Sequence, residues 1–292
     1  MRRHIISTIM ILGALVAVAQ HAPATSSRVC ISINTLLAPS LSALGDMDFY
    51  GSVASVKRTE TFYEGDVTHS ATVVYSFDAN GNTTSRLEQE ADGTSSLTTF
   101  TNIYRNGRLY QVEVDGGLPT CRSITYRYDL NGNVIGCVNT CDTLPQLTTT
   151  TIFDRFRNPL SQKDHINNIE CTFDYQYHPA HAGQVVSRTL LRRDVALDET
   201  VHFTTIYEYD DHNLLTSETT RGGDGPEVLT HYAYNAEGML VSKSTVSGEE
   251  TRVETYKRDE MGSCLWHEVR VNGRLVAQVE SEITYDTPVV MK

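Results

Sequence analysis

The amino-acid sequence predicts an all-β fold in which tandem β-hairpin repeats form a long, twisted or curled antiparallel sheet. Three observations predict it: a recurring Tyr-x-Tyr-Asp-x-x-Gly-like signature, period-2 alternation before each copy, and no helical periodicity in the mature chain. The chain has 292 residues. We expect residues 1–19 to be a signal peptide, residues 20–45 a leader or capping segment, and residues 46–292 the repeat domain.

The first residues have the features of a secretory signal. Arg2 and Arg3 form a basic start, residues 5–19 form an apolar run, and Ala17-Val18-Ala19 is the small-x-small pattern that signal peptidase recognises. The run is shorter than the roughly 20 residues that span a bilayer, which argues against a membrane anchor. We therefore expect cleavage before Gln20 and export to the periplasm or the cell surface.

The repeat is the strongest signal in the sequence. Its copies recur about every 25 residues, with one longer step, which is the signature of a repeat architecture. The clearest copies begin at Tyr75, Tyr126, Tyr207, Tyr232 and Tyr256, weaker members lie around Tyr104, Phe153 and Tyr175, and a terminal one ends at Tyr285-Asp286.

Each copy predicts two strands joined by a turn. Residues 123–128 alternate, so Ile124, Tyr126 and Tyr128 share one face of a half-buried strand. The Asp of each copy can accept backbone N–H bonds, and the Gly three residues later can take the left-handed conformation of a bulged type I turn. The predicted turn residues are Asp78, Gly81, Asp129, Gly132, Asp210, Asn235, Gly238, Asp259 and Gly262.

One hairpin cannot bury its aromatic face alone, so neighbouring hairpins must stack edge to edge and share a core. Doubling the repeat count predicts about sixteen strands, and a sheet of that width should curl.

The charge balance excludes some partners. The formal net charge is −12, and the Lys and Arg residues are scattered, so neither nucleic acid nor an anionic membrane surface is expected to bind. No second apolar stretch approaches spanning length, and we expect no membrane span after the signal is removed.

Six cysteines in an exported chain make disulfides a reasonable expectation. Cys121 and Cys141 flank the predicted turn at residues 129–132 at similar distances, so either Cys141 or Cys137 could approach Cys121. The remaining cysteines have no obvious partner, and no second Cys or His pair lies at zinc-finger spacing.

Other constellations predict neither a metal, a cofactor nor a catalytic residue. His178 and His181 lie at one turn and are expected to be solvated, because a metal needs three or four convergent ligands. The segment from Asp78 to Asn82 has its Gly at the fourth position rather than the sixth of a calcium loop. Carboxylates are dispersed, and no Gly-x-Ser-x-Gly elbow is present.

The dipeptides Tyr128-Asp129, Tyr209-Asp210 and Tyr285-Asp286, with Phe77-Asp78, resemble the Rhs or YD-repeat family over about residues 60–288. The resemblance implies a spiralling β-sheet, which in the large members forms a hollow shell around a C-terminal toxin, and a binding role at the surface or in the periplasm. Only residues 287–292 follow Asp286, and no Asp-Pro-x-Gly-Leu segment is present. We therefore do not expect toxin delivery.

These observations favour an exported, non-enzymatic scaffold that binds a glycan or an envelope protein. Exposed tyrosines and Trp266 are candidates for stacking on sugars. Two alternatives stay open. The first is an outer-membrane-type β-barrel, which needs a uniformly apolar lipid-facing side. The second is a polysaccharide-acting enzyme, which needs two carboxylates roughly 5 to 10 Å apart in a groove.

Overall fold

The computed structural model describes residues 49–116, 123–130, 132–141, 144–156, 158–165 and 168–286. Within these ranges it has eighteen β-strands and no helix, so the predicted all-β class is correct. The expected signal peptide and leader lie outside the described residues. By backbone contacts the chain divides into two compact units. Unit 1 comprises the described residues 49–97, 256–268 and 277–286, and unit 2 comprises residues 98–255 and 269–276.

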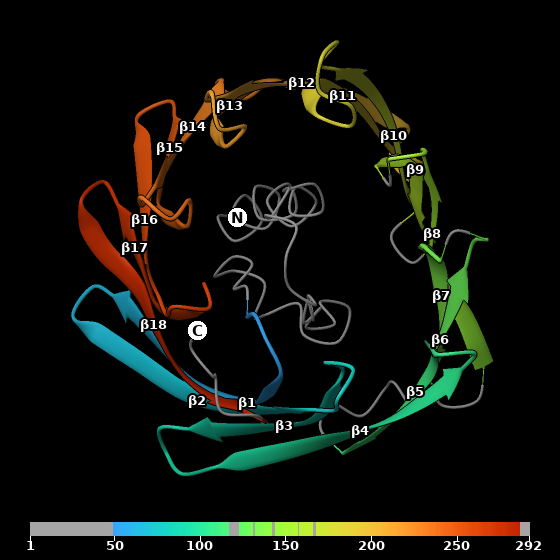
Figure 1. Ribbon diagram of the computed structural model, residues 1–292, viewed down its shortest axis with the longest axis vertical. Coiled ribbons are helices and arrows are strands. Elements are labelled where there is room, and N and C mark those ends of the chain that lie inside the picture. The colour runs from blue at the N-terminus through green and yellow to red at the C-terminus, as the bar shows by residue number, and fades with distance from the viewer. Residues whose placement is uncertain are drawn as a thin grey trace. The chain divides into compact units, whose positions relative to one another are not determined.

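Unit 2 is an antiparallel meander in which each strand pairs with the next one along the chain (Figure 1). Its strands are β4 (Ser95–Arg105), β5 (Arg108–Gly116), β6 (Ser123–Tyr128), β7 (Val134–Cys141), β8 (Leu144–Phe153), β9 (Pro159–Asp164), β10 (Ile169–Tyr177), β11 (Val185–Asp194), β12 (Glu199–Tyr209), β13 (Leu215–Gly222), β14 (Val228–Tyr234), β15 (Leu240–Ser247) and β16 (Glu250–Arg258). The first residues of β4 and the last residues of β16 belong to unit 1.

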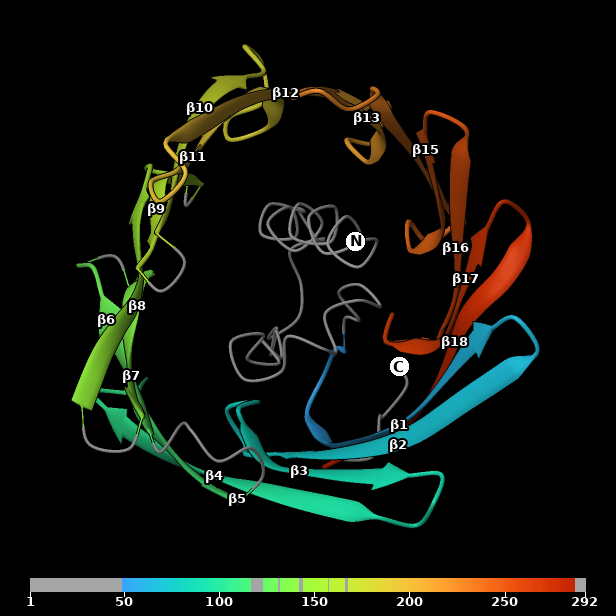
Figure 2. The same cartoon turned by 180° about the vertical axis from the view of Figure 1, so that it is seen from behind.

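Unit 1 joins the two ends of the described chain. Its strands are β1 (Val53–Glu64), β2 (Val67–Phe77), β3 (Thr83–Glu90), β17 (Cys264–Val271) and β18 (Arg274–Tyr285), of which β17 and β18 extend into unit 2. Strands β18, β1, β2 and β3 are antiparallel neighbours in that order. Figure 2 shows β18, drawn in red, beside β1 and β2, drawn in blue.

The sheet buries the face that carries the repeat tyrosines, which we term the tyrosine face. In β12, Phe203, Thr205 and Tyr207 are buried or half-buried, while Ile206 and Glu208 between and beside them are exposed. This alternation is the one that the sequence predicts. In β10 and β11 the tyrosine face forms a small apolar core from Cys171, Phe173 and Leu190, with Ile169, Tyr175 and Phe203 packed against it.

The repeat aspartates form the turns. At Asp210 the carboxylate Oδ1 accepts the backbone N–H groups of His212 and Leu214, both at 2.9 Å. The Asp210 carbonyl accepts the N–H of Asn213 at 3.0 Å, and Asn213 has φ +61° where most copies have glycine. Asparagine tolerates this left-handed conformation better than other non-glycine residues, so the degraded copy keeps the turn. The same pattern of backbone hydrogen bonds recurs at Asp78, Asp129, Asn235 and Asp259.

In several copies of the repeat, the tyrosine directly before the turn joins its hairpin to the preceding one. The hydroxyl of Tyr209 donates to the Val185 carbonyl at 2.8 Å, and that of Tyr234 donates to the Leu215 carbonyl at 2.9 Å. Corresponding bonds run from Tyr128 to the Leu109 carbonyl, from Tyr177 to the Asp154 carboxylate, and from Tyr285 to the Asp259 carboxylate. A hydroxyl bond therefore links successive hairpins at five places in the described chain.

The last copy of the repeat is completed by the N-terminal strand. In an intact copy the N–H of Asp78 donates to the carbonyl of Asn82, four residues on, at 2.9 Å. In the last copy the N–H of Asp286 donates instead to the carbonyl of Ser52 at 2.8 Å. The preceding Gly51 has φ +90° and takes the place of the repeat glycine.

The pairing of the two strands follows the same pattern. Tyr285 pairs with Val53 while Thr284 pairs with Ser55, so the register shifts between these two pairs. The same shift occurs in an intact copy, where Phe77 pairs with Thr83 and Ser76 pairs with Ser85. Strand β1 is thus the missing second strand of the last hairpin. The eighteen strands exceed the expected sixteen because β18, from the terminal copy, and β1 were not counted as a hairpin.

We expect Asp210→Ala to lower the free energy of unfolding by about 1 kcal/mol, because two turn N–H groups lose their acceptor. Asp211→Ala is the matched control, since Asp211 is an exposed neighbour in the same turn. The measurement is the urea unfolding midpoint. Equal midpoints for the two variants would contradict the turn role of Asp210.

We expect Tyr209→Phe to destabilise the protein by about 1 kcal/mol, because the Val185 carbonyl loses its donor while the ring packing is kept. Tyr234→Phe should have a similar effect, and the double variant should lose about the sum, since each hydroxyl serves a different hairpin junction. Thermal unfolding monitored by circular dichroism measures both. Wild-type midpoints in all three variants would show that these hydroxyl bonds contribute nothing.

Candidate functional site

In unit 2 ionisable side chains lie opposite the first tyrosine of several copies. On the tyrosine face Tyr175 pairs with Arg188, and Tyr207 pairs with Glu218. Burial raises the pKa of Tyr175 and of Tyr207 above the ordinary value. The Arg188 guanidinium donates to the Thr205 hydroxyl at 3.3 Å. Among the described residues, Arg188 Nε and Glu218 Oε2 are buried without a hydrogen-bond partner, so the polar groups on this face are only partly satisfied.

Unit 1 carries a buried charged pair on β1. Arg58 Nη2 lies 3.0 Å from Glu60 Oε1, and the two side chains are only 4% and 3% exposed. Burial raises the pKa of the Glu60 carboxyl, and the positive charge of Arg58 opposes that rise. A buried pair of this kind contributes little net stability, but removing one partner leaves an uncompensated charge.

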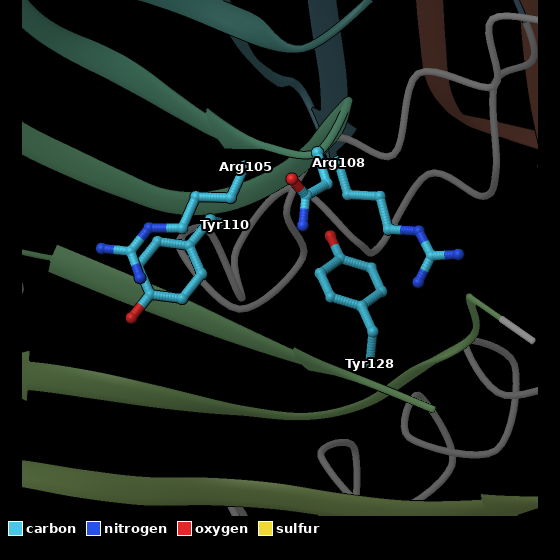
Figure 3. Close-up of a pocket in the computed structure, with 5 residues that line it drawn as sticks. Arg105, Arg108, Tyr110 and Tyr128 are labelled. Atoms are coloured by element: carbon cyan, nitrogen blue, oxygen red, sulfur yellow. The ribbon is translucent and has the colours of Figure 1, made fainter. Parts of the chain in front are cut away.

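A more accessible arrangement lies at the turn between β4 and β5. The turn residues Asn106 and Gly107 have φ +51° and +74°, the left-handed pair of a two-residue hairpin turn. This tight turn places Arg105 and Arg108 on its two sides. Together with Tyr110 and Tyr128 these residues line an open pocket of about 350 Å³ (Figure 3). We term it the arginine–tyrosine pocket, comprising Arg105, Asn106, Arg108, Tyr110 and Tyr128.

Aromatic rings position both guanidinium groups of the pocket. The Arg105 guanidinium carbon lies 3.5 Å from the centroid of the Tyr110 ring, and that of Arg108 lies 5.8 Å from the Tyr128 ring. The Tyr128 hydroxyl donates to the Leu109 carbonyl, which fixes its ring. No ion pair found in the described part of the chain involves Arg105 or Arg108.

The neighbouring repeat leaves room for Arg108. A β-carbon on Gly132 would lie 3.0 Å from Arg108 Nη2, and Gly132 has φ +87°. A side chain at this position would be strained and would press on the guanidinium. The arginine–tyrosine pocket therefore depends on two successive repeats, one supplying the arginines and the other Tyr128 and Gly132.

The predicted site residues lie mainly in turns. Asp78, Asp129, Asp210, Asn235 and Asp259 accept turn N–H groups, and Gly81, Gly132, Gly238 and Gly262 have positive φ. Cys121 lies outside the described residues, as does the side chain of Cys141, so this candidate disulfide is untested. The His178 and His181 rings lie 4.5 Å apart in the loop between β10 and β11. Lys257 Nζ lies 4.7 Å from the centroid of the Trp266 ring.

The sequence reasoning missed the arginine–tyrosine pocket. A signal was present, because the copy at Tyr104 has Arg-Asn-Gly-Arg in place of the repeat aspartate and its loop. Within the described ranges, no three His, Cys, Asp or Glu residues gather as a metal site. The same residues include no helix that is long and apolar enough to cross a membrane.

No family model matches the chain, and no curated protein matches it either. Among solved structures, a porin-like protein from Bacteroides uniformis is 13% identical, with a TM-score of 0.41, over 80% of this chain and 96% of that one. A TcdB2-TccC3-Cdc42 structure is 14% identical, with a TM-score of 0.36, over 75% of this chain and 13% of that one. A structure of TcdB2-TccC3 without its hypervariable C-terminal region is 10% identical, with a TM-score of 0.35, over 85% of this chain and 19% of that one. These similarities are too distant to transfer a function.

The tyrosine hydroxyls that join hairpins should lose their protons at a higher pH than ordinary tyrosines do. Burial is the largest cause that raises the pKa of Tyr177, Tyr209, Tyr234 and Tyr285 to about 12, against about 10 in an unfolded chain. The folded state therefore holds these protons more tightly. The stability that they contribute is complete below about pH 10 and is lost as the pH rises through about 12.

Tyrosinate absorbance measured against pH tests this expectation. The native protein should show a late phase that ends with unfolding, while the chain in denaturant should titrate in one step near pH 10. A single step near pH 10 in the native protein would contradict the raised pKa values.

Proposed function

We propose that this chain is an exported protein of the cell envelope, of the YD-repeat kind, that serves as a non-enzymatic binding scaffold. The observation that supports it most is how the repeat residues are used. The Asp and Tyr residues that recur from copy to copy, such as Asp210 and Tyr209, make hydrogen bonds that form the turns and join neighbouring hairpins. Repeat arrays of this type use their extended surface and their variable loops for contact.

The variable turns are the part of the array that is free to recognise a partner. They lie at the ends of the strands, and they differ from one copy to the next, with Arg-Asn-Gly-Arg after Tyr104 and a longer loop at His178–Gln184. We favour a glycan as the ligand, because the arginine–tyrosine pocket combines ring faces with donors that suit sugar hydroxyls and acidic groups. An envelope protein is the other partner that this scaffold would suit.

A second candidate is an outer-membrane-type β-barrel. The pairing of the first strand, β1, with the last, β18, favours it, because such pairing removes free sheet edges. The face opposite the tyrosines argues the other way. Asp174 and Glu208 are exposed on it, and Lys57 and Glu282 form an exposed ion pair there at 2.8 Å. A lipid-facing surface tolerates few charges near the bilayer midplane.

A binding screen on the mature chain tests the proposal. The protein from Gln20 onward, purified without detergent, should be monodisperse in size-exclusion chromatography, and it should give saturable binding on a glycan array or a single partner in a pull-down from envelope extract. Heat-unfolded protein is the control for non-specific adsorption. Solubility only in detergent, with insertion into liposomes, would favour the barrel over the scaffold. Soluble protein that captures no glycan and no partner would overturn the binding role.

A further inference from the structure

We propose that the arginine–tyrosine pocket binds the carboxylate of an acidic saccharide, such as a uronic-acid unit of a polysaccharide. This inference rests on the proposed binding function and names a ligand class and a site for it. Nothing in the repeat itself requires arginines here. They are present where one copy of the repeat has lost its aspartate and its long turn.

The charge of the pocket points to an anion. The chain carries a formal net charge of −12, yet the pocket presents two exposed guanidiniums, and no carboxylate pairs with either among the described residues. The negative charge of the protein as a whole repels anions at long range. The two arginines of the pocket attract an anion that comes close enough to contact them. Guanidinium groups present paired N–H donors that match the two oxygens of a carboxylate.

The aromatic residues prepare these donors for binding. The Arg105 guanidinium carbon lies 3.5 Å from the Tyr110 ring centroid, and this stacking contact leaves the N–H groups of the guanidinium available to a ligand. Figure 3 shows Arg105 over Tyr110 and Arg108 extending past the Tyr128 ring. A side chain held in this way loses less freedom on binding than a free arginine would.

The shape of the pocket favours a sugar over a bare ion. Its volume of about 350 Å³ is at the lower end of the range of small-molecule sites, and it is open to solvent. A single inorganic ion would leave most of this space and both rings unused. A saccharide unit can place its C–H face on the Tyr128 ring while its carboxylate meets one of the two guanidiniums, and the rest of the polymer can continue into solvent.

Titration calorimetry with the mature chain tests the proposal, with a galacturonic-acid trimer, a neutral glucose trimer and inorganic phosphate as ligands. The acidic trimer should bind saturably, and its affinity should fall as the salt concentration is raised. The neutral trimer and phosphate should each bind at least tenfold more weakly than the acidic trimer. Arg105→Gln and Arg108→Gln should each weaken binding about tenfold. The matched control is Arg127→Gln on β6, an exposed arginine on the opposite face that loses the same charge.

A charge-preserving variant guards against loss of the fold. Arg108→Lys keeps the charge but not the paired donors, so it should also weaken binding while leaving the circular dichroism and the unfolding midpoint unchanged. Wild-type affinity in the Arg105→Gln/Arg108→Gln variant would overturn the site. Equal binding of the neutral trimer would overturn the acidic class, and equal binding of phosphate would overturn the saccharide. If the glycan array is positive while the double variant binds normally, the scaffold proposal stands and this one fails.

Discussion

The bond from a tyrosine hydroxyl to the preceding hairpin is the interaction on which the rest of the structure depends. A β-hairpin by itself is barely stable in water, and main-chain ladders between neighbouring strands specify no particular register at their ends. The hydroxyls of Tyr209 and Tyr234 each reach one specific carbonyl of the previous repeat. The two hairpins that carry Tyr209 and Tyr234 therefore each have a fixed register relative to the preceding hairpin.

This dependence explains the mixed character of the tyrosine face. A face made only of apolar side chains would bury more hydrophobic area, but it would tolerate slippage between strands. Here tyrosines alternate with Arg188, Glu218 and threonines such as Thr205, whose hydroxyl lies 3.0 Å from that of Thr220 on the next strand. Hydrogen bonds between specific partners penalise a shifted register, because a slip would leave buried polar groups unpaired.

The hairpin architecture could be predicted from the sequence because its determinants are local. Alternation over six to ten residues and an Asp with a left-handed residue three positions later define a strand, a turn and a second strand. The completion of the last repeat could not be predicted in this way. The segment Gly51-Ser52-Val53 contains a repeat glycine without the tyrosine and aspartate that precede it in other copies, and these are supplied by Tyr285 and Asp286, far along the chain.

The arginine–tyrosine pocket was missed for a different reason. Its parts come from two copies, and the copy at Tyr104 deviates from the consensus that made the repeat recognisable. The repeat is recognised from the residues that recur, whereas the two arginines of this pocket are residues in which one copy differs from the others. Only the structure shows that residues of two successive copies line one pocket there.

The shared last hairpin has a consequence for how the chain folds during synthesis. Among the strands of the described residues β1 is made first, but its partner β18 is made last. Until then one edge of β1 exposes unpaired backbone groups, the kind of edge that recruits other chains. Closing this contact joins residues far apart in sequence and is expected to be a slow, late step. A chain interrupted before β18 would lack that step altogether, so full-length synthesis becomes a condition for a protected sheet edge.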